Sequence, residues 1–503
     1  MSPFFLFSFV IGYFVLLLIV AFRTSRNSTN DSFFIGNRSS NWMLVAFGMI
    51  GTSLSGVTFV SVPGTVGDFA GDSFKAFGYF QVVIGYWIGY FLIGFILLPL
   101  YYRLQVTSIY NYLHSRFGMT AYRTGALFFI ISRTVGATAR LYLVINVLQI
   151  FILNNIGVSF GVTALIILLM ILLYTFEGGV KTIVYTDTLQ TTFMLLGLIV
   201  CGVYIMKHLG LNPGTALKAL TDKGYTSFLN TDFQSKGFFL KQIIGGMFIT
   251  VAMTGLDQEM MQKNISVKNL RDSRKNMISF SMIMVVVNFM FLFLGGLLYL
   301  FLQNKGGYYN GHQFLMNGNN VIGDDIFPTI ALNYLPKAVS IIFVIGLISA
   351  LFPSADGALT ALTSSFCIDL LGLRNRSDLD DNGKKRIRMT VHICFAIVFL
   401  LCILIFKWIN NKSIINVILD LAGYTYGPLL GLFAFGIFTR RHLPDSWLVT
   451  AICLLMPLAC YFLSKNAASW FGGFQIGIEL LLINGMLTFL GLYIISEKRV
   501  QTN

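Results

Sequence analysis

Apolar runs of about 20 residues recur along this chain and constrain its fold more than any other feature. Each run is long enough to cross the ~30 Å hydrocarbon core of a bilayer as a helix. The composition agrees, since 56% of the 503 residues are hydrophobic and only 11% are charged. The sequence therefore predicts an all-α polytopic integral membrane protein in contact with lipid, without a soluble domain.

We identify about 13 such runs from their length and hydropathy. Their predicted bounds are 3–22, 42–68, 76–101, 122–153, 158–176, 184–206, 240–257, 277–302, 336–366, 389–406, 414–438, 446–463 and 474–495. An amphipathic stretch at 326–335 is predicted to lie on the outer surface. The first run has no basic segment before it, so we interpret it as a retained membrane anchor and not as a signal peptide.

Lysine and arginine are distributed unevenly over the predicted loops. With the N-terminus outside, the inner loops carry about twice as many of these residues as the outer loops, which is the bias expected of cytoplasmic loops. We predict an outside N-terminus and a cytoplasmic C-terminus in a plasma membrane of the bacterial inner-membrane type. This bias also accounts for the net charge of +14 without a nucleic-acid partner.

One predicted span, in the segment ALFPSADGALTALTSSFCID at 350–369, is unusually polar. Its polar residues are Ser354, Asp356, Thr360, Thr363, Ser364 and Ser365. Burying a carboxylate and hydroxyl groups without partners costs several kcal/mol, so ionisable residues inside a membrane are candidates for function. We predict that these side chains face a cation or a cavity.

Two spans are interrupted by small and turn-forming residues. The interruptions are Gly48, Gly51, Ser53, Ser55, Gly56 and Pro63 in the span 42–68, and Gly245, Gly246, Thr254 and Gly255 in the span 240–257. Because these spans are five apart, they cross the membrane in opposite directions, as in the inverted repeats of transporters. Alternatively, the glycines only allow close helix packing.

The inverted-repeat interpretation divides the chain into five parts. Residues 1–41 form an extra helix and an inner loop, 42–206 the first repeat, 207–239 an outer loop, 240–438 the second repeat, and 439–503 two further helices with an inner tail. The sequence favours a protein that acts as a monomer.

Five segments together resemble the sodium:solute symporter family, which includes bacterial proline, sugar and sialic-acid symporters and the sodium/glucose cotransporters. The segments are GTSLSGVTFVSVPG (51–64), VTSIYNYLHSRFG (106–118), EGGVKTIVYTDTLQ (177–190), DQEMMQK (257–263) and the polar segment 350–369. The resemblance implies a LeuT-type core of two five-helix inverted repeats. It also implies sodium-coupled symport of a small organic solute, with a sugar or sugar acid favoured, by alternating access.

The resemblance further implies a sodium site with Na+ as the coupling ion. Matched to the family pattern, its ligands are Gly51, Leu54, Ala350, Pro353 and Ser354. Pro353 departs from the pattern because it has no hydroxyl group. Sodium prefers oxygen ligands, and Asp356 lies on the same helical face as Pro353, so it could supply the lost oxygen.

Asp187 matches an acidic residue that the family keeps beside its cation sites, and we predict that it helps to bind the cation. The alternative is structural. In that case Asp187 and Asp356 pair with Lys181, Arg133 or Arg140 and only hold helices together.

The solute is expected beside the broken helices. Candidate contacts are Ser53, Ser55, Thr58, Tyr79, Phe80 and Gln81. Such a mixed polar and aromatic lining suits a sugar, a polyol or an amino acid. Arg133 and Arg140 are two helical turns apart, or ~10.5 Å, so only one can easily reach a given carboxylate. The resemblance implies such an arginine in carriers of acidic sugars, but the sequence leaves open which one binds solute and which one pairs with an acid.

The DQEMMQK segment resembles a family signature at the inner end of a span. We interpret Asp257, Gln258 and Gln262 as an intracellular gate or structural lock, and Lys263 stands where relatives usually have arginine. Tyr424 is a candidate for closing the outer side.

Other functions fit the sequence less well. A proton-coupled symporter of an amino acid or monocarboxylate is the main alternative, and a channel is a weaker one because no acidic ring accompanies the polar spans. The chain has no HExxH or GxSxG motif and no histidine–aspartate constellation, so we do not expect an enzyme.

Overall fold

The computed structural model describes residues 3–25, 40–67, 75–105, 108–310, 313–316, 318–321, 323–373, 376–409 and 414–498. For residues 3, 4, 25, 176–181, 310 and 319 it describes the backbone alone, so it does not test the predicted partner Lys181. Most of the predicted inner loop at 23–41 and the first two residues of the 106–118 segment lie outside the described ranges.

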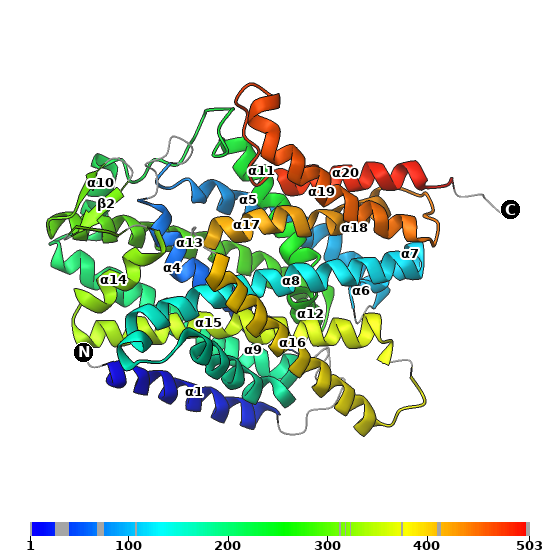
Figure 1. Ribbon diagram of the computed structural model, residues 1–503, viewed down its shortest axis with the longest axis horizontal. Coiled ribbons are helices and arrows are strands. Elements are labelled where there is room, and N and C mark those ends of the chain that lie inside the picture. The colour runs from blue at the N-terminus through cyan, green and yellow to red at the C-terminus, as the bar shows by residue number, and fades with distance from the viewer. Residues whose placement is uncertain are drawn as a thin grey trace.

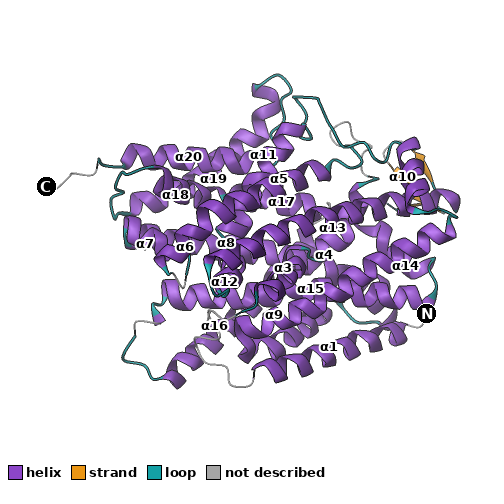
Figure 2. Cartoon of the chain, turned by 180° about the vertical axis from the view of Figure 1, so that it is seen from behind, coloured by secondary structure: helices purple, strands orange, loops and turns teal. Residues whose placement is uncertain are grey.

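The chain folds into a bundle of long helices that run mostly along the longest axis of the molecule (Figure 1). The helices that are not sharply broken are α1 (Pro3–Ser25), α5 (Tyr79–Leu92), α6 (Leu98–Leu104), α8 (Met119–Leu148), α9 (Phe160–His208), α13 (Leu270–Asn304), α15 (Lys337–Ser365), α16 (Asp381–Ile409), α19 (Trp447–Trp470) and α20 (Leu480–Ile495). A π-helical turn joins α5 to α6. Figure 2 shows how completely helices dominate the chain.

Three further spans are bent pairs of helices, broken by more than 40°. They are α3 (Trp42–Ser53) with α4 (Gly56–Thr65), bent by 57°, α11 (Phe239–Thr250) and its π-helical turn with α12 (Gln258–Ile265), bent by 66°, and α17 (Ile414–Thr425) with α18 (Gly427–Phe438), bent by 46°. The first two bends lie in or next to the predicted interruptions, whereas the third falls in a span that we predicted to be continuous.

Every predicted span coincides with an apolar helix. Within the described ranges, eight helices are long and apolar enough to cross a membrane, and the three bent pairs pass the same test jointly. Two shorter apolar helices, Phe160–Thr175 and Leu480–Ile495, cover the remaining predicted spans. The two predicted spans at 158–176 and 184–206 belong to one helical element, α9. The prediction of an all-α polytopic membrane protein is confirmed.

The two ends of the chain lie at opposite ends of the bundle (Figure 1). The N-terminal end also carries the short helices α10 (Pro213–Asp222) and α14 (Ile326–Asn333) and a small antiparallel sheet of β1 (Tyr308–Asn310), β2 (Gln313–Met316) and β3 (Asn319–Asn320). The C-terminal end carries α7 (Asn111–Phe117). The helix α10, in the predicted outer loop 207–239, is therefore at the same end as the N-terminus.

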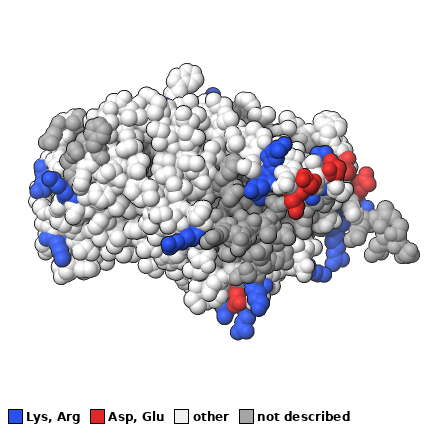
Figure 3. Space-filling model, turned by 90° about the horizontal axis from the view of Figure 1, so that it is seen from below, with Lys and Arg blue, Asp and Glu red and all other residues white. Residues whose placement is uncertain are grey.

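The surface has the character expected of a membrane protein. On the face shown in Figure 3, uncharged side chains form a broad area, and the charged side chains gather mostly in patches at its edges. Large apolar side chains such as Trp408, Phe462 and Ile494 are exposed on helices. Lipid would cover such side chains in a bilayer.

The first break follows from residues that leave the helical conformation. Leu54 and Ser55 leave the helical region, with ψ of 82° and 179°, so α3 ends and α4 starts again at a different angle. The glycines also allow close packing, because a Cβ on Gly51 would overlap Oγ1 of Thr191. The structure thus shows both a broken helix and close helix packing at these glycines, whereas the inverted repeats stay a prediction.

The second broken span continues beyond its predicted bounds of 240–257. Residues 258–265, which we left outside the predicted spans, form the helix α12. Asp257 accepts a hydrogen bond from the backbone N–H of Met260, 3.2 Å away, and so caps α12. All residues of α12 are buried. A hydropathy scale does not predict a buried helix here because it treats charged residues as exposed to water, whereas the charged residues of α12 are paired inside the protein.

Candidate functional site

A pocket of about 790 Å³, partly open to solvent, lies at the break between α3 and α4. Its polar lining residues are Thr52, Ser53, Ser55, Thr58, Tyr79, Tyr86, Tyr90, Arg133, Arg140, Thr250, Thr254 and Asn288. The structure thus brings the predicted residues Ser53, Ser55 and Thr58 together around one cavity. Gln81 is not among the lining residues, and its amide donates to the carbonyl of Gly78 at 3.2 Å.

The two arginines of α8 have different surroundings. Nη1 of Arg133 lies 3.7 Å from Oδ2 of Asp257, and Nη2 donates to Oε2 of Glu259, so this guanidinium is shared by two carboxylates. Arg140 also lines the pocket, but no carboxylate of the described residues lies within ion-pair distance of it. The structure therefore places Arg133 in an ion pair and leaves Arg140 facing the pocket.

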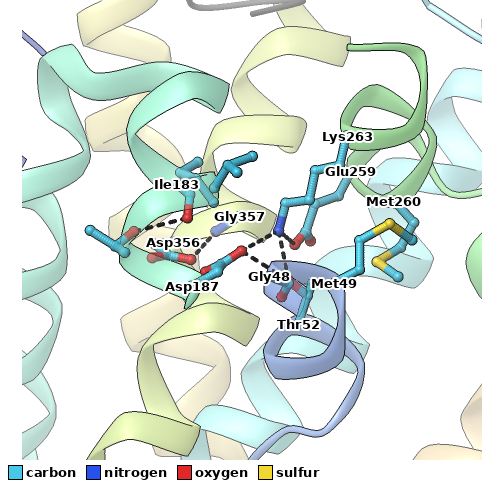
Figure 4. Close-up of polar contacts among 12 residues, drawn as sticks. Gly48, Met49, Thr52, Ile183, Asp187, Glu259, Met260, Lys263, Asp356 and Gly357 are labelled. Carbon is cyan, nitrogen blue, oxygen red and sulfur yellow. Dashed lines mark hydrogen bonds and ion pairs between the residues drawn. The ribbon is translucent and has the colours of Figure 1, made fainter. Parts of the chain in front are cut away.

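Asp187 of α9 has a basic partner that the sequence did not indicate. The ammonium nitrogen of Lys263 lies 2.7 Å from its Oδ2, and the hydroxyl of Thr52 donates to the same oxygen at 3.0 Å (Figure 4). Oδ1 of Asp187 is buried without a hydrogen-bond partner among the described residues. The alternative in which Asp187 forms an ion pair between helices is thus partly correct, but its partner is Lys263 and not Arg133 or Arg140.

Glu259 links these two groups. It accepts from Arg133 through Oε2, and its Oε1 lies 3.4 Å from the ammonium of Lys263. Neither Glu259 nor Thr52 was a predicted site residue. The spacing of four between Glu259 and Lys263 on α12 is the one sequence signal that could have indicated the pair.

Asp356 of α15 is buried without a nearby base. The hydroxyl of Tyr174 donates to its Oδ2 at 2.7 Å. No lysine or arginine of the described residues lies within ion-pair distance of this carboxylate. Figure 4 shows it next to the carboxylate of Asp187, with which it interacts electrostatically. A carboxylate in this setting favours a bound cation or a proton.

The predicted backbone ligands of sodium lie on the elements that surround this group. Gly51 is in the last turn of α3, Leu54 is the residue that ends it, and Ala350 and Ser354 are buried in α15. A Cβ on Gly56, just beyond the break, would lie 3.8 Å from the carbonyl oxygen of Ala350. The break of the first span thus lies close to the predicted ligand segment of α15.

The predicted gate residues occupy separate places. Oδ2 of Asp257 lies 3.4 Å from the hydroxyl of Tyr426, and Oε1 of Gln258 accepts from the backbone N–H of Ile109 at 3.0 Å. Gln262 is buried in α12. The ring of Tyr424 packs 6.1 Å from that of Tyr461 on α19, away from the residues that line the pocket. A gating role for these four residues stays a prediction.

The chain matches a known family over most of its length. The sequence model of the sodium:solute symporter family matches residues 33–446. The chain belongs to the sodium:solute symporter family. The predicted family and its sodium-coupled symport are thereby confirmed at family level.

Individual relatives of this symporter differ in what they carry. The sodium/sialic acid symporter SiaT of Proteus mirabilis is 22% identical over 493 residues, which cover 95% of this chain and 93% of that relative. The sodium-coupled monocarboxylate transporter 1 of Mus musculus is 26% identical over 430 residues, which cover 83% of this chain and 66% of the mouse protein.

The fold of this symporter matches a solved structure over nearly its whole length. A Na+-coupled sialic acid symporter in a substrate-bound, outward-open state aligns with a TM-score of 0.79 over 98% of this chain and 99% of that one, at 18% identity. This likeness establishes the fold.

Proposed function

We propose that this symporter takes up a small organic anion, with a sugar acid favoured, together with sodium. The observation that carries the proposal is Arg140, a cation in the central pocket with no acidic partner among the described residues. A guanidinium without a carboxylate inside a membrane protein is costly, and a carboxylate on the solute would compensate it with two parallel hydrogen bonds.

The rest of the pocket suits a hydroxylated solute. Ser55, Thr58 and Asn288 offer hydrogen-bonding groups, and Tyr79 and Tyr86 offer flat apolar faces. A few fixed polar groups in a largely apolar cavity give orientation and specificity. That some relatives carry sialic acid, an acidic sugar, supports this choice of solute class.

For the coupling ion we propose a site at the break of the first span. Its ligands are the predicted Gly51, Leu54, Ala350 and Ser354, with the carboxylate of Asp356 in place of the hydroxyl that Pro353 lacks. One sodium ion entering down a tenfold gradient supplies about 1.4 kcal/mol, and a potential of 100 mV adds about 2.3 kcal/mol. The observation that favours this site is the absence of a base beside Asp356 within the described residues.

The remaining elements of the proposal follow from the sequence. The N-terminus lies outside and the C-terminus in the cytoplasm of a bacterial-type inner membrane. Residues 42–206 and 240–438 act as the two inverted repeats, and the protein works as a monomer. Labelling of single cysteines near each terminus with an impermeant reagent would test the orientation.

Ligand-dependent thermal stability of the purified protein tests the proposed solute and ion together, since a ligand that binds the folded state must stabilise it. The panel includes sialic acid, uronic acids, neutral sugars, amino acids and monocarboxylates, each in sodium and in potassium. We expect a shift with an acidic sugar that is larger in sodium. A shift with neutral sugars alone would contradict the proposal.

The matched variants are Arg140→Gln and Arg140→Lys. We expect Arg140→Gln to lose uptake of the anionic solute, and Arg140→Lys to keep part of it because the charge remains without the bidentate geometry. Equal uptake by wild type and Arg140→Gln would remove the solute role of this residue.

A monocarboxylate is the second candidate solute. The same arginine would bind it, and the likeness to a sodium-coupled monocarboxylate transporter supports it. The panel separates the two, since only a hydroxylated acid would use Ser55, Thr58 and Asn288. A shift with acetate or propionate, which carry no hydroxyl group, and none with sugar acids would favour this candidate.

A further inference from the structure

The ammonium group of Lys263 is held by oxygen atoms from three helices. Its nitrogen lies 2.7 Å from Oγ1 of Thr52 in α3, 2.7 Å from Oδ2 of Asp187 in α9 and 3.4 Å from Oε1 of Glu259 in its own helix α12. A lysine ammonium has three donors, so all of them are used. Figure 4 shows these side chains converging on the nitrogen.

These surroundings are those of a bound monovalent cation. Hydroxyl and carboxylate oxygens are the ligands that hard cations prefer, and the whole group is buried, with Asp187 fully inaccessible and Lys263 2% exposed. Thr52 follows the predicted sodium ligand Gly51, and Asp187 is itself a predicted cation ligand. The ammonium therefore sits where the sequence led us to expect an external ion.

We propose that Lys263 is a fixed, covalently attached cation of the cation-binding region, so that each transport cycle uses one external sodium ion. This inference rests on the proposed sodium-coupled function. Asp356, a ligand of the proposed sodium site, lies next to Asp187 (Figure 4). Oδ1 of Asp187 is buried without a hydrogen-bond partner among the described residues, so it can complete the ligand set of that one sodium ion.

The charges near Asp187 and Asp356 support different roles for these two carboxylates. Lys263 compensates the charge of Asp187 directly, whereas the hydrogen-bond donors to Asp356 in the described structure are the hydroxyl of Tyr174 and the backbone N–H of Gly357. A second sodium ion at Oδ2 of Asp187 would have to displace the ammonium or lie against it, and like charges at such distances repel strongly. One free place for a cation remains, beside Asp356.

Because Lys263 is covalently attached to the chain, it cannot drive transport. An external ion contributes the free energy of its gradient in each cycle, but a lysine cannot leave the protein and contributes none. Lys263 can still connect the two broken spans, since its partner Thr52 lies on α3 and its own backbone on α12. Lys263 would thus hold these helices together as a bound ion would, without increasing the number of sodium ions used in each transport cycle.

Equilibrium binding of radioactive sodium to the purified full-length protein tests this inference. We expect about one ion per chain at saturation in the wild type, about two in Lys263→Met, which keeps the length of the side chain but removes its charge, and about one in Lys263→Arg, which restores it. Binding of two ions by the wild type, or unchanged binding by Lys263→Met, would overturn the inference.

If Lys263→Met does not fold, a double variant that removes one charge of each sign tests the inference. Lys263→Met combined with Asp187→Asn removes both charges of the pair but keeps a side-chain oxygen beside Asp356, so we expect a folded protein that binds about one ion, more weakly than the wild type does. If the double variant is also unfolded, or binds two ions, the fixed-cation inference is wrong. A wild type that binds no sodium overturns the proposed function itself, whereas a wild type that binds sodium with no effect of Lys263 overturns this inference alone.

Discussion

Oε2 of Glu259 accepts a hydrogen bond from Arg133, and Oε1 of the same carboxylate lies 3.4 Å from the ammonium nitrogen of Lys263. Because Lys263 also contacts Asp187, a continuous chain of buried charges runs from the wall of the pocket at the α3–α4 break to the proposed cation-binding region. Two sites joined by such contacts can influence each other's affinity, and this influence is reciprocal. The network is therefore a physical route by which sodium and solute binding could be coupled.

Removing the charge of Arg133 should destabilise the fold. Arg133→Gln leaves Asp257 and Glu259 short of positive charge in a buried place, and breaking a buried pair in this way costs about 3–5 kcal/mol. We expect a clearly lower unfolding midpoint of the detergent-purified protein. Adding Glu259→Gln should recover part of the loss, and Arg140→Gln, which breaks no ion pair, should leave the midpoint almost unchanged. Equal destabilisation by both arginine variants would contradict the different roles assigned to them.

Neutralising Asp356 should weaken sodium binding without unfolding the protein. Asp356→Asn keeps an acceptor for the hydroxyl of Tyr174 but removes the charge that no lysine or arginine of the described residues compensates. We expect at least a tenfold increase in the sodium concentration for half-maximal uptake, equivalent to about 1.4 kcal/mol. Tyr174→Phe removes the hydrogen bond alone and should have a smaller effect. An unchanged sodium requirement in Asp356→Asn would show that the ion binds elsewhere.

The hydroxyl of Ser354 offers a milder test of the same site. It donates to the carbonyl of Leu351 at 3.1 Å, and its lone pairs remain available to an ion. Ser354→Ala should raise the half-maximal sodium concentration while transport at saturating sodium is largely kept. If the titration curve does not move, Ser354 is not a sodium ligand. Thr363→Ala, in the same helix but hydrogen-bonded to His392, is the matched control.

A methyl group at Gly357 should disturb the charge network. A Cβ there would overlap Oε1 of Glu259, so the carboxylate would have to move away from Lys263. Overpacking of this kind typically costs about 1–3 kcal/mol, and we expect Gly357→Ala to lower the unfolding midpoint accordingly. Gly136→Ala is the control, because a methyl group on Gly136 would have no neighbouring atom within 4 Å. A Gly357→Ala protein as stable as Gly136→Ala would show that Glu259 can reposition freely.

Asp369, just beyond the C-terminal end of α15, should fix this end of the helix to the 106–118 segment. Its carboxylate accepts hydrogen bonds from Ser108 at 2.9 Å, Tyr122 at 2.7 Å and Ser365 at 2.7 Å. A hydrogen bond to a charged group contributes about 1.5–3 kcal/mol, so Asp369→Ala should destabilise the protein more than Tyr122→Phe, which removes one donor. Thermal unfolding of the two variants measures this difference, and the reverse order would argue against Asp369 as the common acceptor.

Several features could be predicted from the sequence because they depend on local composition. The glycines and hydroxyl residues around Leu54 indicated a broken helix, and the apolar run that includes the polar residues of 350–369 indicated a helix, which the structure shows to be buried. The third bend, at Tyr426, was missed although Gly427 and Pro428 follow it directly. The helix α12 was missed because hydropathy treats every charged residue as facing water.

The sequence by itself determined that this chain crosses a membrane many times, that two of its spans are interrupted and to which family it belongs, since these depend on residues close together along the chain. Only the tertiary structure decided how the buried charges pair. Arg133 and Glu259 are 126 residues apart, and Asp187 and Lys263 are 76 apart. Which of two arginines remains for a solute, and which acid remains for an ion, depends on the packing of α8, α9, α12 and α15 against one another. Coulomb interactions act over distances in space, and packing is what brings these distant residues within a few ångströms.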